Sequence, residues 1–138
     1  MAQEEKNVEV LKNAYKKWHD TKAGSVDHWF GLMTEDVKFR SLGAGAAQIE
    51  FTRASTSKEE VKRYFAGLTS GWEMIGYVID EYIAQGERVV AVGRCSFKNK
   101  KTGKILDTPK ADFHRFRGGK ICEFFEFYDT AQVISCAA

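Results

Sequence analysis

Apolar residues recur every three or four positions near the start of the chain and at about every second position in its second half. One side of a helical wheel over residues 4–20 collects Val8, Leu11, Tyr15 and Trp18. This spacing predicts an amphipathic helix. A partial cap at Ser25 predicts a short second helix over 26–33. Ser57 with Glu60 three positions later forms a capping box ahead of a third helix.

The pattern after Gly71 is typical of β-strands. One earlier alternating run, at 37–40, predicts a short strand between the second and third helices. Four later runs, rich in β-branched and aromatic residues and bounded by turn residues, cover 72–83, 88–97, 105–116 and 120–128. Consecutive strands joined by short turns favour an antiparallel meander. We therefore expect an α+β fold with helices packed on a sheet.

Two of these strands are apolar on both faces. Residues 89–92 show no alternation, and 122–128 place aromatic side chains at odd and even positions alike. Three helices can cover one side of a sheet, so the other side needs a further partner. We expect a homodimer formed through the sheet, because the chain predicts no additional helices for that role.

Composition and charge indicate a single domain and exclude some classes of binding partner. The 138 residues, 43% of them hydrophobic, suit one domain over 1–138, because a chain this short rarely holds two cores. The 21 Lys and Arg against 19 Asp and Glu leave a formal charge of +2, too small and too mixed to imply nucleic acid or a membrane surface as a partner. The basic run 98–104 is expected to be an exposed hairpin tip.

The cysteines and the first residues of the chain indicate the cellular compartment and whether a metal site is expected. Three cysteines without paired spacing support neither a disulfide framework nor a zinc site, so we interpret them as reduced thiols and expect no metal. No stretch is apolar enough to span a membrane, and the first residues lack a signal-peptide pattern. We therefore expect a cytoplasmic protein.

The segment 112–129, Asp-Phe-His-Arg-Phe-Arg-Gly-Gly-Lys-Ile-Cys-Glu-Phe-Phe-Glu-Phe-Tyr-Asp, resembles the last two strands and tight turn of nuclear transport factor 2-like proteins. Residues 29–39 are similar to that superfamily's second helix and first strand. The superfamily includes ketosteroid isomerase, limonene epoxide hydrolase and SnoaL-like polyketide cyclases. The resemblance covers nearly the whole chain and implies a cone: three N-terminal helices on a strongly curved, mixed or antiparallel sheet that encloses a pocket.

Asp112 resembles the buried acid of ketosteroid isomerase, in the pattern Asp, two residues, Arg, Phe. Burial among phenylalanines would raise its pKa, so that it either donates a hydrogen bond or accepts a proton. The alternative is that Asp112 is solvated or bonded to Lys110 or Arg115. Tyr15 lies near the position of the isomerase's hydroxyl donor. The position of the isomerase's base, however, holds Ser41, which disfavours steroid isomerisation.

Glu126 resembles the water-activating carboxylate of limonene epoxide hydrolase, and Arg94 resembles the central arginine of that enzyme. The acid expected two residues after the arginine is replaced here by Ser96, so an epoxide oxygen has no obvious proton donor unless Asp112 serves. For Arg94, a structural ion pair is the alternative interpretation.

The hairpin loop decides whether Asp112 and Glu126 share a face. A three-residue loop over 117–119 places Asp112 opposite Phe124 and both acids on one side, whereas a two-residue loop over 118–119 moves Glu126 to the other side. We favour the three-residue loop. His114 would then line the same side and relay protons, or else be a partly exposed histidine at the dimer face.

An apolar pocket in this fold would be lined by aromatic side chains that select a small, flat, hydrophobic or cyclic ligand. The candidate lining residues are Trp18, Trp29, Phe30, Phe51, Phe65, Trp72 and Phe124. Segment 43–53 is expected to be the flexible rim, because its small residues pack poorly.

Two functions remain open. The first is a cofactor-independent enzyme of the isomerase, cyclase or hydratase type, in which Asp112 and Glu126 handle the proton and Arg94 is their electrostatic partner. Tyr15 or His114 would donate a hydrogen bond to the developing oxyanion. The second is a non-catalytic ligand-binding or dimeric interaction module in which the same residues are buried structural groups.

Overall fold

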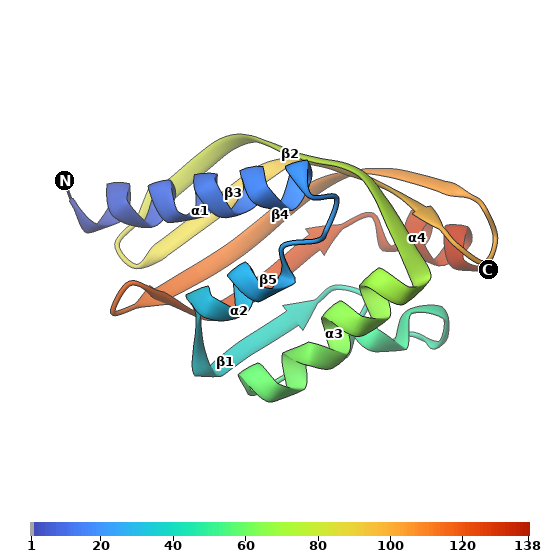
Figure 1. The fold of residues 1–138 in the computed structure, drawn as a ribbon, viewed down its shortest axis with the longest axis horizontal. Helices are drawn as coiled ribbons and strands as arrows, with labels where there is room; N and C mark the ends of the chain where they lie inside the picture. The colour runs from blue at the N-terminus through green and yellow to red at the C-terminus, as the bar shows by residue number, and fades with distance from the viewer. Residues whose placement is uncertain (1) are drawn as a thin grey trace.

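Residues 2–138 of the computed structural model form four α-helices, one 3-10 helix and five strands (Figure 1). The helices are α1 (Gln3–Asp20), α2 (Val26–Leu32), η1 (Ala47–Thr52, the 3-10 helix), α3 (Lys58–Gly71) and α4 (Thr130–Ala137). The strands are β1 (Met33–Ser41), β2 (Trp72–Gln85), β3 (Arg88–Asn99), β4 (Ile105–Arg117) and β5 (Lys120–Tyr128). The helices and strands expected from hydrophobic periodicity are confirmed. The α4 helix, eight residues long, is an additional element at the end of the chain.

The five strands form one mixed sheet in the order β1-β5-β4-β3-β2. The meander of β2 to β5 is antiparallel, as expected. Strand β1 is longer than the predicted run and pairs parallel to β5, with Phe39 beside Phe124 and Ser41 beside Glu126. This pairing brings the segment after α2 next to the last strand and makes the sheet mixed.

The helices α1, α2 and α3 lie in one layer over one face of the sheet (Figure 1). Burial alternates along β4: Leu106, Thr108, Lys110, Asp112, His114 and Phe116 are buried, and the residues between them are more exposed.

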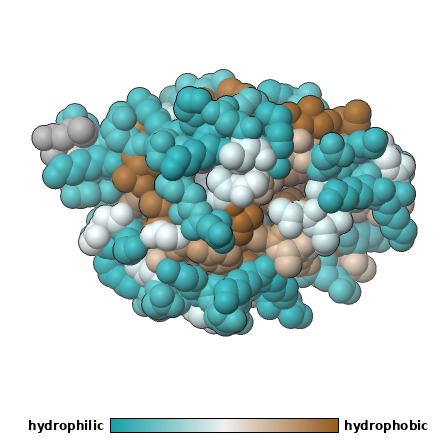
Figure 2. All heavy atoms as spheres, in the orientation of Figure 1, coloured by the Kyte–Doolittle hydropathy of each residue, from teal (hydrophilic) through white to brown (hydrophobic). Residues whose placement is uncertain are grey.

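The outer surface of this helical side is largely hydrophilic, with apolar patches between the polar side chains (Figure 2). No helix among residues 2–138 has both the length and the apolar character needed to cross a membrane.

The sheet is not strongly curled, which corrects the expected cone of high curvature. A sharp curl needs β-bulges or glycine kinks across neighbouring strands. The central pair β3–β4 runs without a register shift from Arg88 opposite Arg115 to Lys98 opposite Ile105. The shifts lie in the other strand pairs, so the middle of the sheet keeps a regular ladder.

Asp112 and Glu126 lie on the same face of the β4–β5 hairpin, as expected, but for a reason that the sequence analysis did not predict. Its turn is the two-residue loop Gly118–Gly119, both at positive φ, so the three-residue loop was wrong. The register then shifts, because Cys122 is an extra residue between the pairs Phe116–Ile121 and Arg115–Glu123. This bulge returns Glu126 to a position directly opposite Asp112.

The segment 43–53, expected to be a flexible rim, is packed along part of its length. Ile49 and Thr52 are buried within η1, and the Gly43 amide donates to the Tyr128 hydroxyl at 2.9 Å. A Cβ atom at Gly43 would lie 2.5 Å from the Ile49 side chain and 2.8 Å from that hydroxyl. Gly43 therefore allows close packing, whereas Ala44 and Ala47 of the same segment are exposed.

Candidate active site

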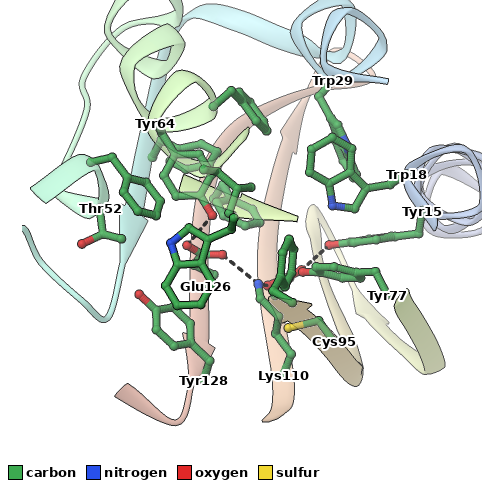
Figure 3. Close-up of a pocket in the computed structure, with 18 of the residues that line it drawn as sticks. Tyr15, Trp18, Trp29, Thr52, Tyr64, Tyr77, Cys95, Lys110, Glu126 and Tyr128 are labelled. Carbon is green, nitrogen blue, oxygen red and sulfur yellow. Dashed lines mark hydrogen bonds and ion pairs between the residues drawn. The ribbon is translucent and has the colours of Figure 1, made fainter. Parts of the chain in front are cut away.

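A cavity of about 90 Å³ lies between the helical layer and the inner face of the sheet (Figure 3). Its lining is mostly aromatic and aliphatic, with contributions from every helix and strand. Six of the seven predicted lining residues border it: Trp18, Trp29, Phe51, Phe65, Trp72 and Phe124. Phe30 does not line the cavity; it packs on Phe65 at 5.4 Å between ring centroids. Its neighbour Trp29 on α2 faces the cavity instead, because adjacent helical residues point in different directions.

Lys110 is the centre of the polar wall of this cavity. Its Nζ atom donates to Asp112 Oδ1 at 2.6 Å and to Glu126 Oε1 at 2.7 Å. The three side chains are 7%, 1% and 5% exposed, respectively. The structure thus brings the two predicted acids together and bridges them with a buried ammonium group. Figure 3 shows Lys110 beside Glu126.

Three tyrosines complete the hydrogen bonding of the two acids. Tyr15 of α1 and Tyr77 of β2 donate to Asp112 Oδ2 at 2.7 and 2.5 Å. Tyr64 of α3 donates to Glu126 Oε2 at 2.6 Å. With Lys110 included, Asp112 accepts three hydrogen bonds and Glu126 accepts two.

The charge state of Asp112 differs from the sequence-based expectation. Burial by itself would raise the pKa of this carboxyl, but the Lys110 charge, together with hydrogen bonds from Lys110 and Tyr77, lowers it below its ordinary value. Burial likewise opposes the charged form of Lys110, yet the two carboxylates raise its pKa. Asp112 is therefore an ionised acceptor, and the prediction of a raised pKa was wrong.

His114 lies on the same wall, two residues from Asp112. It is 1% exposed, and its Nε2 atom lies 2.7 Å from the Tyr15 hydroxyl. Its ring stacks on Trp29 with an angle of 7° between planes. Burial lowers the pKa of His114 to about 4, so the ring is neutral near pH 7. The alternative of a partly exposed histidine at a dimer face was wrong.

Arg94 is the one predicted catalytic residue that lies away from the cavity. It is exposed and pairs with Asp107, with 3.1 Å between Arg94 Nη2 and Asp107 Oδ1. The reason is strand alternation on β3: Cys95 points inward, so Arg94 points outward. Arg94 therefore forms an ion pair on the surface, which was the alternative interpretation. The cation next to the two acids is Lys110.

Sequence reasoning missed the central role of Lys110 and the part played by Tyr77. Lys110 could have been found from the sequence, because it lies two residues before Asp112 and therefore on the same face of β4 as Asp112 and His114. Tyr77 had none, because register shifts near Ile75 and Asp80 interrupt the alternation of β2. Residues 2–138 contain no cluster of histidine, cysteine or acidic side chains arranged to hold a metal ion.

Helices packed over a mixed five-stranded sheet, with a polar wall inside an aromatic cavity, define a nuclear transport factor 2-like protein. The sequence model of the SnoaL-like domain family matches residues 15–124. The chain belongs to this family. No curated protein sequence matches the chain.

Solved structures agree with this fold. A nuclear transport factor 2-like protein of unknown function from Burkholderia pseudomallei K96243 superposes with a TM-score of 0.82 at 18% identity, covering 100% of this chain and 99% of that one. A protein from Jannaschia sp. CCS1, provisionally described as a SnoaL-like polyketide cyclase, gives 0.78 at 20% identity, with 99% and 95% covered. TerC, crystallised with polyporic acid, gives 0.78 at 18% identity, with 96% and 98% covered. At these identities the likeness concerns the fold.

Proposed function

We propose that this protein is a cofactor-independent enzyme of the isomerase, cyclase or hydratase type that moves a proton on a small apolar substrate. The observation that supports this function most directly is the group of two carboxylates around one buried ammonium, on the wall of an otherwise aromatic cavity. Water-poor surroundings strengthen electrostatic interactions with any charge that develops on a bound molecule.

Glu126 is the base in this proposal. A hydrogen bond donated to a carboxylate stabilises the charged form and makes the group a weaker base. Asp112 accepts three such bonds and Glu126 two, so we assign the role of base to Glu126, the carboxylate with fewer bonds from the protein. Asp112 then acts as the anchor that holds Lys110 and two tyrosines in place.

Lys110 is the group that stabilises negative charge on the substrate. An ammonium has three N–H donors, and the carboxylates use two of them. The remaining donor is available to an oxygen of the substrate as charge develops there. Tyr15 and His114, the donors first considered for this task, are bonded to each other, and Tyr15 also donates to Asp112.

The relatives support a small-molecule pocket. The Jannaschia protein carries the provisional description of a polyketide cyclase, and TerC was crystallised with polyporic acid. A homodimer through the sheet stays a prediction alongside this proposal. Ile75, Val78 and Phe127, which are exposed on β2 and β5, are the side chains it would cover.

The test is hydrogen exchange at an acidic carbon. Cyclohexanone, a small cyclic ketone, is incubated with the protein in D₂O, and the loss of its α-proton signals is followed by NMR. We expect saturable exchange that falls about 10²- to 10⁴-fold in Glu126→Gln, because the base is removed. Glu123→Gln is the matched control: Glu123 lies on the same strand, outside the cavity, paired with Arg115 at 3.5 Å. Exchange that is absent in the wild type, or equal in both variants, contradicts the enzymatic proposal.

The alternative function is a non-catalytic ligand-binding module. One observation favours it: every carboxylate oxygen of Asp112 and Glu126 already accepts a hydrogen bond from the protein. Such satisfied groups suit a structural role. Saturable binding of cyclohexanone without exchange, unaltered by Asp112→Asn, would support this module over the enzyme.

A further inference from the structure

We propose that His114 Nδ1 accepts a hydrogen bond from the ligand of this cavity, which makes the ligand class a flat apolar molecule that carries a hydroxyl or N–H donor. This inference deepens the proposed function and rests on it only in taking the cavity as the ligand site. It concerns a group that the proton-transfer scheme leaves unused.

The contacts of Tyr15 fix which nitrogen of His114 carries the proton. An ionised carboxylate only accepts hydrogen bonds, so the single Tyr15 hydroxyl proton is donated to Asp112. The Tyr15 oxygen then accepts from His114 Nε2 at 2.7 Å, and that nitrogen must bear a hydrogen. A neutral imidazole has one N–H, so Nδ1 is a bare acceptor.

This acceptor has no partner within the described residues. Nδ1 is a buried side-chain atom without a hydrogen bond, although the other nitrogen of the same ring is bonded. An unsatisfied buried polar atom destabilises a protein, and it calls for an explanation such as a bound molecule. His114 lines the cavity, so a molecule within the cavity can supply the donor once it displaces the atoms that cover the buried Nδ1.

The surroundings of the ring favour a donor on an apolar body over a water molecule. The Trp29 ring lies nearly parallel to His114, and Phe124 lies 5.1 Å away between centroids. A buried water is stable when it makes two to four hydrogen bonds, and aromatic faces offer few. A planar ring with one hydroxyl would pair Nδ1 and bury its remaining surface against these aromatics.

The first experiment reads His114 directly by ¹⁵N NMR of the wild-type protein, with His114→Phe used to assign the signals. We expect the free protein to show a protonated Nε2 and an Nδ1 that accepts no hydrogen bond. Phenol, the probe, should move the Nδ1 resonance to lower chemical shift, whereas toluene, which has the same shape without the hydroxyl, should not. A proton on Nδ1, an Nδ1 already hydrogen-bonded to water, or no response to phenol overturns the proposal.

The second experiment measures affinity for the same two probes by calorimetry. We expect the wild type to bind phenol about fivefold more tightly than toluene, in the range of one net hydrogen bond. His114→Phe should lose this preference, and Leu106→Val, a cavity residue away from His114, should keep it. Equal affinity of the wild type for the two probes, or a preference that survives in His114→Phe, contradicts the proposal.

These readouts do not depend on catalysis. If cyclohexanone shows no exchange while phenol still moves the Nδ1 resonance, the enzymatic proposal fails and the ligand class stands. If exchange depends on Glu126 while Nδ1 ignores phenol, the ligand class fails and the enzymatic proposal stands.

Discussion

Two cation–carboxylate pairs on β3 and β4 have similar chemistry and different surroundings. Lys110 and Asp112 face the cavity at 2.6 Å, with side chains 7% and 1% exposed. Arg94 and Asp107 lie on the opposite face of the sheet at 3.1 Å, with 55% and 63% exposed. In the first pair the pKa of the lysine is raised and that of the aspartate is lowered, because little water screens the charges.

The contrast shows that the side of the sheet determines what such a pair can do. An exposed pair is screened by water and salt, and it contributes between zero and about 1 kcal/mol to stability. A buried pair depends on each partner, because a charge left alone in an apolar site is costly. The inner pair can therefore act on a bound molecule, whereas the outer pair is a surface contact.

The largest expected effect is that of Lys110→Met. The variant leaves Asp112 and Glu126 facing each other without their shared cation, so we expect it to lower the free energy of unfolding by about 3–5 kcal/mol. Urea denaturation at pH 7 measures the change. Arg94→Met on the outer pair is the matched control, with a loss below about 1 kcal/mol. Equal losses in the two variants would show that burial does not separate the pairs.

A second test uses acid and the buried histidine. Above pH 6.5 His114 is neutral in both the folded and the unfolded chain. Between pH 6.5 and its folded pKa of about 4, only the unfolded chain binds the proton, so stability falls as the pH falls through that window. The full difference is about 3 kcal/mol. Urea denaturation at pH 7 and pH 4.5 should show a smaller acid-induced loss in His114→Phe than in the wild type, and parallel losses would contradict the assignment.

The smallest of these effects concerns the tyrosines of β2. Tyr77→Phe removes a hydrogen bond to the ionised Asp112, and bonds to charged groups contribute about 1.5–3 kcal/mol. We expect a loss of about 2 kcal/mol. Tyr82 lies on the same strand, is half-buried and does not line the cavity, so Tyr82→Phe should change stability little. Comparable losses in the two variants would mean that packing, not the hydrogen bond, holds Tyr77.

Local pattern was enough to predict helices α1 to α3 and the five strands, and the resemblance of segments 29–39 and 112–129 to nuclear transport factor 2-like proteins indicated the family. The hydrophobic periods of 3.6 residues for helices and 2 for strands depend only on near neighbours in the chain. The two adjacent glycines, Gly118 and Gly119, likewise indicate a turn. The same alternation put Asp112 and His114 on one face of β4, and it contained the signal for Lys110 as well. The prediction for Arg94 failed because it followed the resemblance to another enzyme's arginine, whereas alternation along β3 turns Cys95 inward and Arg94 outward.

The sequence by itself determined which elements form and which side chains of β4 face the core, because both follow from contacts within a few residues. Only the tertiary structure decided that the extra residue Cys122 returns Glu126 to the face of Asp112. It also decided that Tyr15 and Tyr64, 97 and 62 positions from the acids they bond, meet them in the cavity. Whether Lys110 and Asp112 keep their charges depends on these distant partners, since burial and hydrogen bonds together set a pKa.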